Sequence, residues 1–206
     1  MGNLPRLPRP TEMAHRLLSE RIQEGDTVID ATVGNGYDTL FLSNCVGENG
    51  SVIGFDLQAV AIEKTRERTG NRPNVILHHS GHETLDNFVA APVAAITFNL
   101  GYLPGGDKYL ITGKASTLTA LQKSVTLLKA GGLLTVVAYI GHEGGPEEGE
   151  AVSDWASSLD QDNFSVARYE FQNQKNSPPF LLAIEKRPAP FRTCLLYTSD
   201  AADDQA

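Results

Sequence analysis

Residues 27–39 most constrain what this chain can fold into. An apolar, β-branched run ends in Asp30, passes through a tight loop with Gly34 and Gly36, and continues into a helical pattern that begins at Tyr37. Glycine in such a loop can adopt positive φ and lets a ligand approach without meeting a Cβ. A strand, a glycine loop and a helix N-terminus in this order are typical of the place where an open α/β sheet holds a nucleotide-like ligand.

Strand and helix patterns alternate along the rest of the chain. Strands are expected at residues 27–30, 51–56, 74–79, 93–99, 133–139, 164–172 and 180–186, and helices at residues 11–23, 37–46, 59–69, 82–88, 114–129 and 147–159. Unbroken β-α alternation predicts a parallel sheet with right-handed crossovers. The last two strands are joined by a short connection, which requires them to be antiparallel. We therefore expect a seven-stranded, mostly parallel sheet that ends in an antiparallel hairpin.

Length and composition predict one globular domain. The chain has 206 residues, of which 41% are hydrophobic and 20% are charged, values that are ordinary for a globular protein. The domain is expected to span residues 11–187, after an irregular, basic lead-in at residues 1–10. Residues 188–206 have no partner pattern and resemble translated sequencing-adapter read-through. This tail is therefore expected to be disordered and not native.

Three features predict a cytoplasmic protein without a membrane partner. The chain has no run of about 18 apolar residues, and its first residues lack a signal-peptide pattern. Cys45 and Cys194 lack metal-ligand spacing and indicate a reducing compartment.

The formal net charge of −8 argues against broad, nonspecific coating of nucleic acid but is compatible with a local basic patch.

Spacing around the glycine loop favours S-adenosylmethionine over a dinucleotide. A dinucleotide fingerprint has a third glycine where this chain has Thr39. Asp30 lies four residues before Gly34, where methyltransferases place a carboxylate under the cofactor loop. Asp56 lies twenty residues after Gly36, as expected for a carboxylate that accepts hydrogen bonds from both ribose hydroxyls. The alternative is a glycine turn and a surface aspartate that hold no ligand.

The end of the third strand carries His78, His79 and, three residues later, His82. Three histidines so close could ligate zinc, but no carboxylate or cysteine completes a convincing ligand set, and we expect no metal. Gly81 and His82 are instead expected to border the adenine of the cofactor. The alternative for this segment is a plain helix cap made by Ser80.

The end of the fourth strand, residues 98–108, is expected to hold the chemistry. Asn99 and Tyr102 keep the spacing of the Asn-Pro-Pro-Tyr motif of amino-methylating enzymes, in which the polar side chain and a backbone carbonyl accept hydrogen bonds from the attacked amine. Such acceptors orient the nitrogen lone pair toward the methyl group, and Tyr102 could stack on a flipped base. Leu100 and Gly101 replace the two prolines, which predicts a looser backbone and a roomier pocket. The alternative is a structural glycine loop.

The body of the chain, residues 11–187, resembles a family of small bacterial proteins labelled “putative rRNA methylase”. Its resemblance is carried by residues 30–42, 55–58, 98–108, 139–145 and 173–180, and the family also has Thr where this chain has Thr32. It implies a single Rossmann-like class I methyltransferase domain. The family is associated with methylation of 5-aminomethyl-2-thiouridine at the tRNA wobble position, which implies S-adenosylmethionine as cofactor and the tRNA anticodon stem-loop as partner.

The loop spacing and this resemblance together assign residues to the site. The cofactor-binding set is Asp30, Thr32, Gly34, Asn35, Gly36, Asp38, Thr39, Asp56, Gln58, Gly81, His82 and Asn99. The substrate-binding set is Gly101, Tyr102, Gly105, Gly106, Asp107 and Lys108. The catalytic set is Asn99, Tyr102 and His142, where His142 is either a proton acceptor or an ordinary loop histidine. RNA phosphates would need Lys108, Lys114, Lys175 or the arginines at 6 and 9.

Three hypotheses for function remain at this point. The first is a bacterial N-methyltransferase that acts on the wobble uridine of tRNA and forms a homodimer. The second is a methyltransferase that acts on an rRNA base amine, because the glycine loop and the Asn-x-x-Tyr spacing also fit that reaction. The third is a non-catalytic nucleotide- or RNA-binding module on the same fold.

Overall fold

The computed structural model describes residues 6–89, 92–101, 103, 105 and 112–188. Its elements in chain order are α1 (Pro10–Arg21), β1 (Thr27–Asp30), α2 (Tyr37–Val46), β2 (Ser51–Asp56), α3 (Ala59–Arg68), β3 (Val75–His79), the 3-10 helix η1 (His82–Asn87), β4 (Val93–Leu100), α4 (Lys114–Leu127), β5 (Leu128–Ala138), α5 (Gly145–Ser157), β6 (Phe164–Tyr169) and β7 (Phe180–Lys186). Cys194 and all but the first residue of the predicted tail at 188–206 lie outside the described residues. No helix of the described chain is long and apolar enough to span a membrane.

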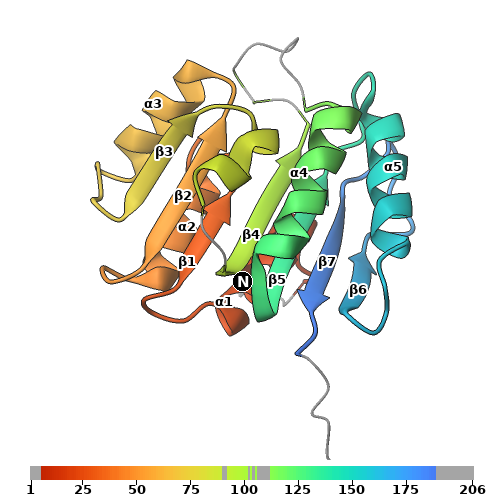
Figure 1. Cartoon of the computed structure of the whole chain (residues 1–206). Helices are drawn as coiled ribbons and strands as arrows, with labels where there is room; N and C mark the ends of the chain where they lie inside the picture. The colour runs from red at the N-terminus through yellow and green to blue at the C-terminus, as the bar shows by residue number, and fades with distance from the viewer. Residues whose placement is uncertain (1–5, 90–91, 102, 104, 106–111, 189–206) are drawn as a thin grey trace, which may run out of the picture.

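The seven strands form one sheet in the order β3-β2-β1-β4-β5-β7-β6 (Figure 1). Strands β1 to β5 pair in parallel, whereas β7 is antiparallel to both β5 and β6. The expected mostly parallel sheet with an antiparallel C-terminal hairpin is therefore confirmed. Strand order reverses between β1 and β4, and such a switch point opens a crevice at the carboxyl ends of the strands.

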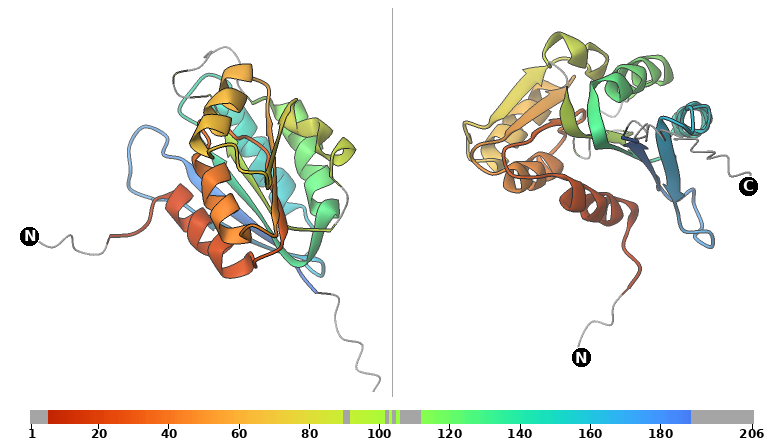
Figure 2. Two further views of the ribbon diagram at one scale, coloured as in Figure 1. Left: turned by 90° about the vertical axis from the view of Figure 1, so that its left-hand side faces the viewer. Right: turned by 60° about the horizontal axis from the view of Figure 1, so that its bottom comes forward.

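Helices cover both faces of the sheet (Figure 2). On one face, α1 and α2 pack apolar side chains such as Leu18 and Leu42 against the sheet, and α3 lies beside them. On the other face, η1, α4 and α5 contribute Leu85, Leu121 and Val152 to the larger apolar core. Because both faces are covered, β4 is apolar along nearly its whole length, as is typical of a central parallel strand.

Two predicted boundaries differ from the structure by more than two residues: the start of the fifth strand and the end of the sixth. The fourth long helix was expected to reach residue 129 and to stop at the glycines at 131 and 132, but α4 ends at Leu127 and β5 begins at Leu128. The glycines instead lie inside β5, where the pairing with β4 shifts register between Val93 and Ala95. Gly131 has φ of +75°, so it serves a strand irregularity and not a helix end. The sixth strand ends at Tyr169, three residues earlier than residue 172.

The glycine loop after β1 depends on close backbone packing. Gly36 has φ of +80°, and a Cβ at this position would lie 2.8 Å from the Cα of Thr65 on α3. Only glycine satisfies both the conformation and the contact. The loop between β1 and α2 is therefore packed closely against α3.

The segment before α1 is also fixed to the domain. The Glu12 carboxylate accepts a hydrogen bond from the backbone N–H of Arg9 (2.8 Å), and this bond caps the start of α1. The same carboxylate forms an ion pair with Arg6. The hydroxyl of Tyr169 on β6 donates to the carbonyl of Pro8 (2.7 Å). These contacts attach α1 to the antiparallel end of the sheet, so α1 can present side chains to the crevice.

Candidate active site

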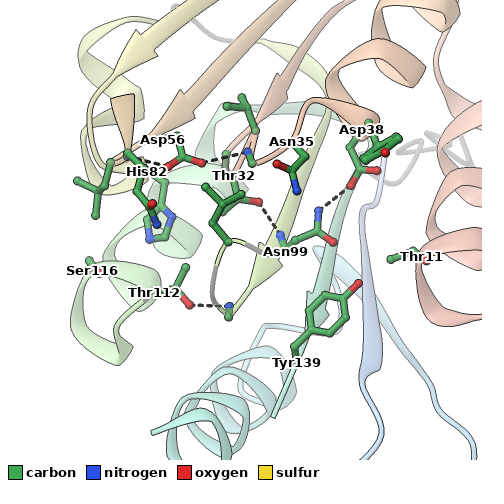
Figure 3. A pocket seen from close by; sticks show the side chains of 18 of the residues that line it. Thr11, Thr32, Asn35, Asp38, Asp56, His82, Asn99, Thr112, Ser116 and Tyr139 are labelled. Carbon is green, nitrogen blue, oxygen red and sulfur yellow. Dashed lines mark hydrogen bonds between the residues drawn. The ribbon is translucent and has the colours of Figure 1, made fainter. Parts of the chain in front are cut away.

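A cavity of about 680 Å³ lies at the carboxyl ends of the parallel strands, at the switch point between β1 and β4 (Figure 3). Its size is within the usual range for a small-molecule or cofactor site. Its walls come from the loop after β1, the ends of β2, β4 and β5, and the facing sides of α1, η1 and α4. Segments that are far apart in the sequence therefore meet around one hollow.

Hydrogen bonds to both neighbouring strands hold the loop after β1. The N–H of Val33 donates to the carbonyl of Phe55 on β2 (3.0 Å). On the other side, the N–H of Asn99 on β4 donates to the hydroxyl of Thr32 (2.7 Å). Below the loop, the hydroxyl of Thr65 donates to the carbonyl of Gly34 (3.2 Å). The loop is thus a fixed wall of the cavity.

Asp56 closes one end of the cavity. Its carboxylate accepts hydrogen bonds from the backbone N–H groups of Gly34 (3.0 Å) and Gln58 (2.9 Å). Burial raises the pKa of this carboxyl against the effect of the two backbone bonds. Each oxygen keeps a second lone pair, so the group can still accept hydroxyl donors from a ligand. A carboxylate placed here fits a ribose, as its spacing from the loop predicts.

Asp30 lies beneath the loop and does not line the cavity. It is fully buried, and it accepts hydrogen bonds from the hydroxyl of Thr39 (2.6 Å) and the N–H of Thr32 (3.2 Å). Burial first, and then the charge of Asp38, raise the pKa of Asp30 to about 7. Gly36 and Thr39, which were also assigned to the cofactor, share this position behind the wall. These residues support the loop.

Asp38 connects two other elements at the opposite end of the cavity. One carboxylate oxygen lies 2.7 Å from Nε2 of His15 on α1, and the other accepts a hydrogen bond from Nδ2 of Asn99 on β4 (2.6 Å) (Figure 3). Burial pushes the pKa of Asp38 up, but the bonds from His15 and Asn99 and the charge of His15 outweigh it and lower the pKa. Asp38 is therefore a carboxylate, which can only accept hydrogen bonds.

His82 lines the cavity from η1, whereas Gly81 does not. The imidazole is 7% exposed and packs edge-on against Phe98 (5.5 Å between ring centroids). Burial lowers the pKa of His82, which favours a neutral ring. Within the part of the chain that the structure describes, no group of three or more His, Cys, Asp or Glu side chains is placed to hold a metal ion.

Hydrogen bonds join Gly101 to Thr112, the residues on either side of the segment that follows β4. Gly101 and Thr112 exchange two hydrogen bonds, one from the N–H of Gly101 to the Thr112 hydroxyl (2.9 Å) and one from the N–H of Thr112 to the Gly101 carbonyl (3.1 Å). The Thr112 hydroxyl donates to Oε2 of Glu148 (2.7 Å), and the Thr117 hydroxyl donates to Oε1 (2.6 Å). A buried carboxylate of α5 thus fixes both ends of this segment.

Only part of the predicted acceptor residues can be placed. Gly101 lines the cavity, whereas Gly105 does not. His142 lies behind Gly101, where a Cβ on the glycine would be 3.5 Å from Nε2, and its Nδ1 is 2.9 Å from the carbonyl of Glu143. His142 is therefore a neighbour of the cavity wall and does not line it. The other predicted acceptor residues, Tyr102, Gly106, Asp107 and Lys108, lie outside the described residues.

Comparison with known proteins decides the family. A family model described as “Putative rRNA methylase” matches residues 52–185, which is more than half of the chain. The protein named “tRNA (mnm(5)s(2)U34)-methyltransferase, chloroplastic” from Arabidopsis thaliana is 38% identical over 191 residues, which cover 86% of this chain and 70% of that protein. The chain belongs to the rRNA methylase family. The resemblance identified in the sequence is therefore confirmed.

Two crystal structures are similar to this rRNA methylase family member over nearly all of their own length. A “putative rRNA-methylase” from Clostridium thermocellum is 44% identical, with a TM-score of 0.86, covering 88% of this chain and 100% of its own. A “putative methyltransferase” from Streptococcus mutans, solved in complex with SAH, is 43% identical, with a TM-score of 0.81, covering 88% and 99%. The predicted Rossmann-like class I methyltransferase fold and the methyltransferase class are confirmed.

Six polar side chains of this family member line the cavity although the sequence analysis did not assign them to it: Thr11, His15, Tyr37, Thr112, Ser116 and Tyr139. Tyr139 is 40% exposed at the end of β5, and burial raises the pKa of its phenol. Its place could have been inferred, because residue 139 was expected at the carboxyl end of a strand in a parallel sheet, the edge where such sheets bind ligands. No periodicity signal places α1 at the site, because the helix reaches the cavity only through tertiary packing.

Proposed function

We propose that this protein is a tRNA methyltransferase that converts the 5-aminomethyl group of (2-thio)uridine at the wobble position into 5-methylaminomethyl. Membership of the rRNA methylase family makes it a methyltransferase acting on RNA. The finer assignment is supported by the Arabidopsis relative, whose name gives the (mnm(5)s(2)U34) reaction. The substrate would then be the anticodon stem-loop of tRNA. The expected homodimer stays a prediction.

S-adenosylmethionine is the methyl donor. It supplies a methyl group on a positively charged sulfonium, and transfer of that methyl leaves a neutral thioether. Asp56 and Gln58 would hold the ribose and adenine end, with His82 bordering the base. Asn35 and the loop after β1 would hold the amino-acid end. The cavity suits a cationic ligand, because the carboxylates of Asp38 and Asp56 line it.

The observation that carries the proposal is the orientation of the Asn99 side chain. Nδ2 donates to the Asp38 carboxylate, so the amide oxygen Oδ1 is on the other side and faces the Tyr139 side of the cavity (Figure 3). An amide oxygen at this place can accept an N–H of an amine and turn the nitrogen lone pair toward the methyl group. An acceptor of this kind suits an amine nucleophile, since an amine carries N–H donors.

The acceptor must lose its charge before it can react. An alkyl ammonium has no lone pair, and desolvation next to the sulfonium lowers the pKa of the amine and favours its neutral form. Once the nitrogen attacks, the new N–C bond forms as the C–S bond breaks with its electron pair going to sulfur. The methylated ammonium then releases a proton to solvent. The exposed ring of Tyr139 at the mouth offers a surface for the pyrimidine.

Nucleoside mass spectrometry on tRNA that carries 5-aminomethyluridine at the wobble position tests this function. Incubation with the protein and S-adenosylmethionine is expected to add one methyl to that nucleoside. Asn99→Ala is expected to lower kcat by about 100-fold, because it removes an acceptor that orients the nucleophile. Asn87→Ala is the matched control, since Asn87 is exposed at the end of η1.

Each other outcome has a distinct meaning. If the wobble nucleoside gains no methyl while SAH still binds, the proposed acceptor is wrong and rRNA becomes the substrate to examine. If Asn99→Ala methylates as fast as the wild type, the proposed role of Asn99 is wrong. Equal RNA binding by wild type and variant, with no transfer by either, would favour a non-catalytic RNA-binding protein.

A further inference from the structure

Three side chains from three elements form a continuous hydrogen-bonded chain at the amino-acid end of the cavity. His15 on α1 lies 2.7 Å from one oxygen of Asp38 on α2, and the other oxygen accepts from Nδ2 of Asn99 on β4 (2.6 Å). The side chains of His15 and Asp38 are 32% and 19% exposed, so this pair is shielded more than an ordinary surface ion pair. Figure 3 shows the Asp38 to Asn99 contact at the cavity wall.

His15, the first residue of this hydrogen-bonded chain, is held by contacts outside the loop after β1. The imidazole of His15 stacks on Phe41 of α2, with ring centroids 4.0 Å apart and an interplanar angle of 7°. Helix α1 itself is fixed by the buried side chains of Ala14 and Leu18 and by the capping contact of Glu12. The stacking therefore fixes the plane of the His15 ring, and its Nε2 lies toward Asp38.

Asn99 by itself has two orientations that are nearly equal in shape. Rotation of the amide by 180° would exchange the oxygen and the NH2 group. In the rotated form the NH2 group would face the acceptor amine and donate to the lone pair that must attack, which prevents transfer. A carboxylate at Asp38 rejects this form, because it would place the Asn99 oxygen against a negative charge.

Asp38 can do this only while its own carboxylate stays in place. His15 donates to the oxygen that Asn99 does not use, so both oxygens are engaged by side chains on opposite sides. Without His15, the carboxylate could rotate into the cavity and bind the acceptor as an ammonium ion. An ion pair of that kind would raise the pKa of the amine and retain the unreactive form.

We propose that His15 and Asp38 are positioning residues for methyl transfer, and that the His15–Asp38–Asn99 chain holds the amide oxygen of Asn99 toward the acceptor amine. This inference rests on the proposed function for its kinetic consequence. It assigns the N-terminal helix a part in the reaction, although α1 lies outside the strand-loop-helix unit that binds the cofactor.

Two variants of His15 separate hydrogen-bond donation from packing. His15→Leu keeps an apolar side chain against Phe41 but removes the donor, and we expect kcat to fall by about tenfold, as for loss of one hydrogen bond in the transition state. His15→Gln keeps a donor at a similar reach, and kcat is expected to stay within about twofold of the wild type. Glu20→Gln, an exposed change on the same helix, is the control.

Two further measurements do not depend on the RNA substrate. The affinity for SAH is expected to fall less than kcat in His15→Leu, since the amide oxygen that the chain orients faces the acceptor. The side-chain NH2 resonances of Asn99, assigned by their loss in Asn99→Ala, are expected to shift in His15→Leu and to remain in place in His15→Gln and Glu20→Gln. If the wild type does not methylate tRNA, the proposed function fails, and these resonances still decide the role of His15.

Several results would overturn the inference. Unchanged kcat and unchanged Asn99 resonances in His15→Leu would show that the chain does not set the amide. Equal losses in His15→Gln and His15→Leu would show that donation is not what matters. A loss of SAH affinity that matches the loss of kcat would place the role of His15 in cofactor binding.

Discussion

Three aspartates surround the glycine loop, and their surroundings give them different roles. Asp56 lines the cavity with backbone donors on both oxygens, and burial raises its pKa. Asp38 lines the cavity with its pKa lowered by His15 and Asn99. Asp30 is fully buried below the loop, and burial raises its pKa to about 7. The same functional group therefore serves as a ligand for hydroxyls, as an orienting charge and as a loop support.

Asp30 should make the stability of the protein depend on pH. Its folded pKa of about 7 is above the ordinary value of 3.8. Between these values the folded state holds a proton that the unfolded state has released, so stability falls as pH rises from about 4 to about 7. In Asp30→Asn this dependence is expected to disappear, and the free energy of unfolding relative to wild type should rise across that window by roughly 2 to 4 kcal/mol.

Urea denaturation of both proteins at intervals from pH 4.5 to 8 measures this difference. The asparagine also changes the hydrogen bonds of Thr32 and Thr39, but that effect is a constant offset at every pH. Asp154→Asn, an exposed change on α5, should give a curve parallel to wild type. If Asp30→Asn is also parallel to wild type, the burial of Asp30 does not control its protonation.

For single residues, the sequence predicted which carboxylates lie near the glycine loop but not whether each one faces the cavity. The twenty-residue spacing between Gly36 and Asp56 predicted a carboxylate at the cavity, and Asp56 lies there. The four-residue spacing between Asp30 and Gly34 predicted a carboxylate under the loop, and Asp30 lies there. The spacing could not show that the Asp30 side chain does not line the cavity, because its direction depends on the twist of β1 and the packing of α2.

Among the elements, the segment between β4 and α4 depends on a contact that the sequence does not suggest. Glu148 lies near the start of α5 and is 3% exposed. Its carboxylate accepts the hydroxyls of Thr112 and Thr117, and Thr112 is paired with Gly101 at the cavity wall. The negative charge also suits the first turn of a helix. Glu148 therefore ties α5 to α4 and to the base of the predicted acceptor segment.

Glu148→Ala tests this connection. Loss of the carboxylate leaves the buried hydroxyl of Thr117 and the partly buried hydroxyl of Thr112 without their acceptor, and we expect the free energy of unfolding to fall by about 2 to 3 kcal/mol. Amide hydrogen exchange at Gly101 and Thr112 should become faster, because the hydrogen-bonded pair loses its anchor. Glu147→Ala, an exposed neighbour on the same turn, is the control. Equal stability and equal exchange in the two variants would contradict the anchoring role.

The order and type of the elements followed from the sequence because the β-α alternation is unbroken. Boundaries were less certain where glycine can serve more than one purpose. Gly131 and Gly132 were interpreted as a helix stop, but they lie in a strand irregularity next to β4. A glycine pair indicates unusual backbone geometry, and only the register of the neighbouring strand shows which geometry it is.

For the whole molecule, the parallel sheet fixes the site at the carboxyl ends of its strands, and this much was predictable. The place of β7 between β5 and β6, and the docking of α1 beside them, were not. Pro8 meets Tyr169 across the sheet edge, a contact between segments 161 residues apart. Contacts of such long range leave no local signal, so the contribution of His15 and Thr11 to the cavity required the structure.

Binding of SAH should stabilise the whole domain, since the cavity joins α1, three parallel strands and the helices on both faces. A ligand at 100 times its Kd adds about 2.7 kcal/mol to the free energy of unfolding. For a domain of this size that corresponds to a rise in Tm of roughly 5 to 10 °C, measurable by differential scanning fluorimetry.

In Asp56→Ala the rise should be mostly lost, because the ribose hydroxyls lose their carboxylate acceptor and the N–H groups of Gly34 and Gln58 lose their partner. NAD at the same concentration should give no rise, since Thr39 stands where a dinucleotide site has its third glycine. An equal rise with NAD, or a full rise in Asp56→Ala, would show that the cavity does not hold the nucleoside as inferred from its walls.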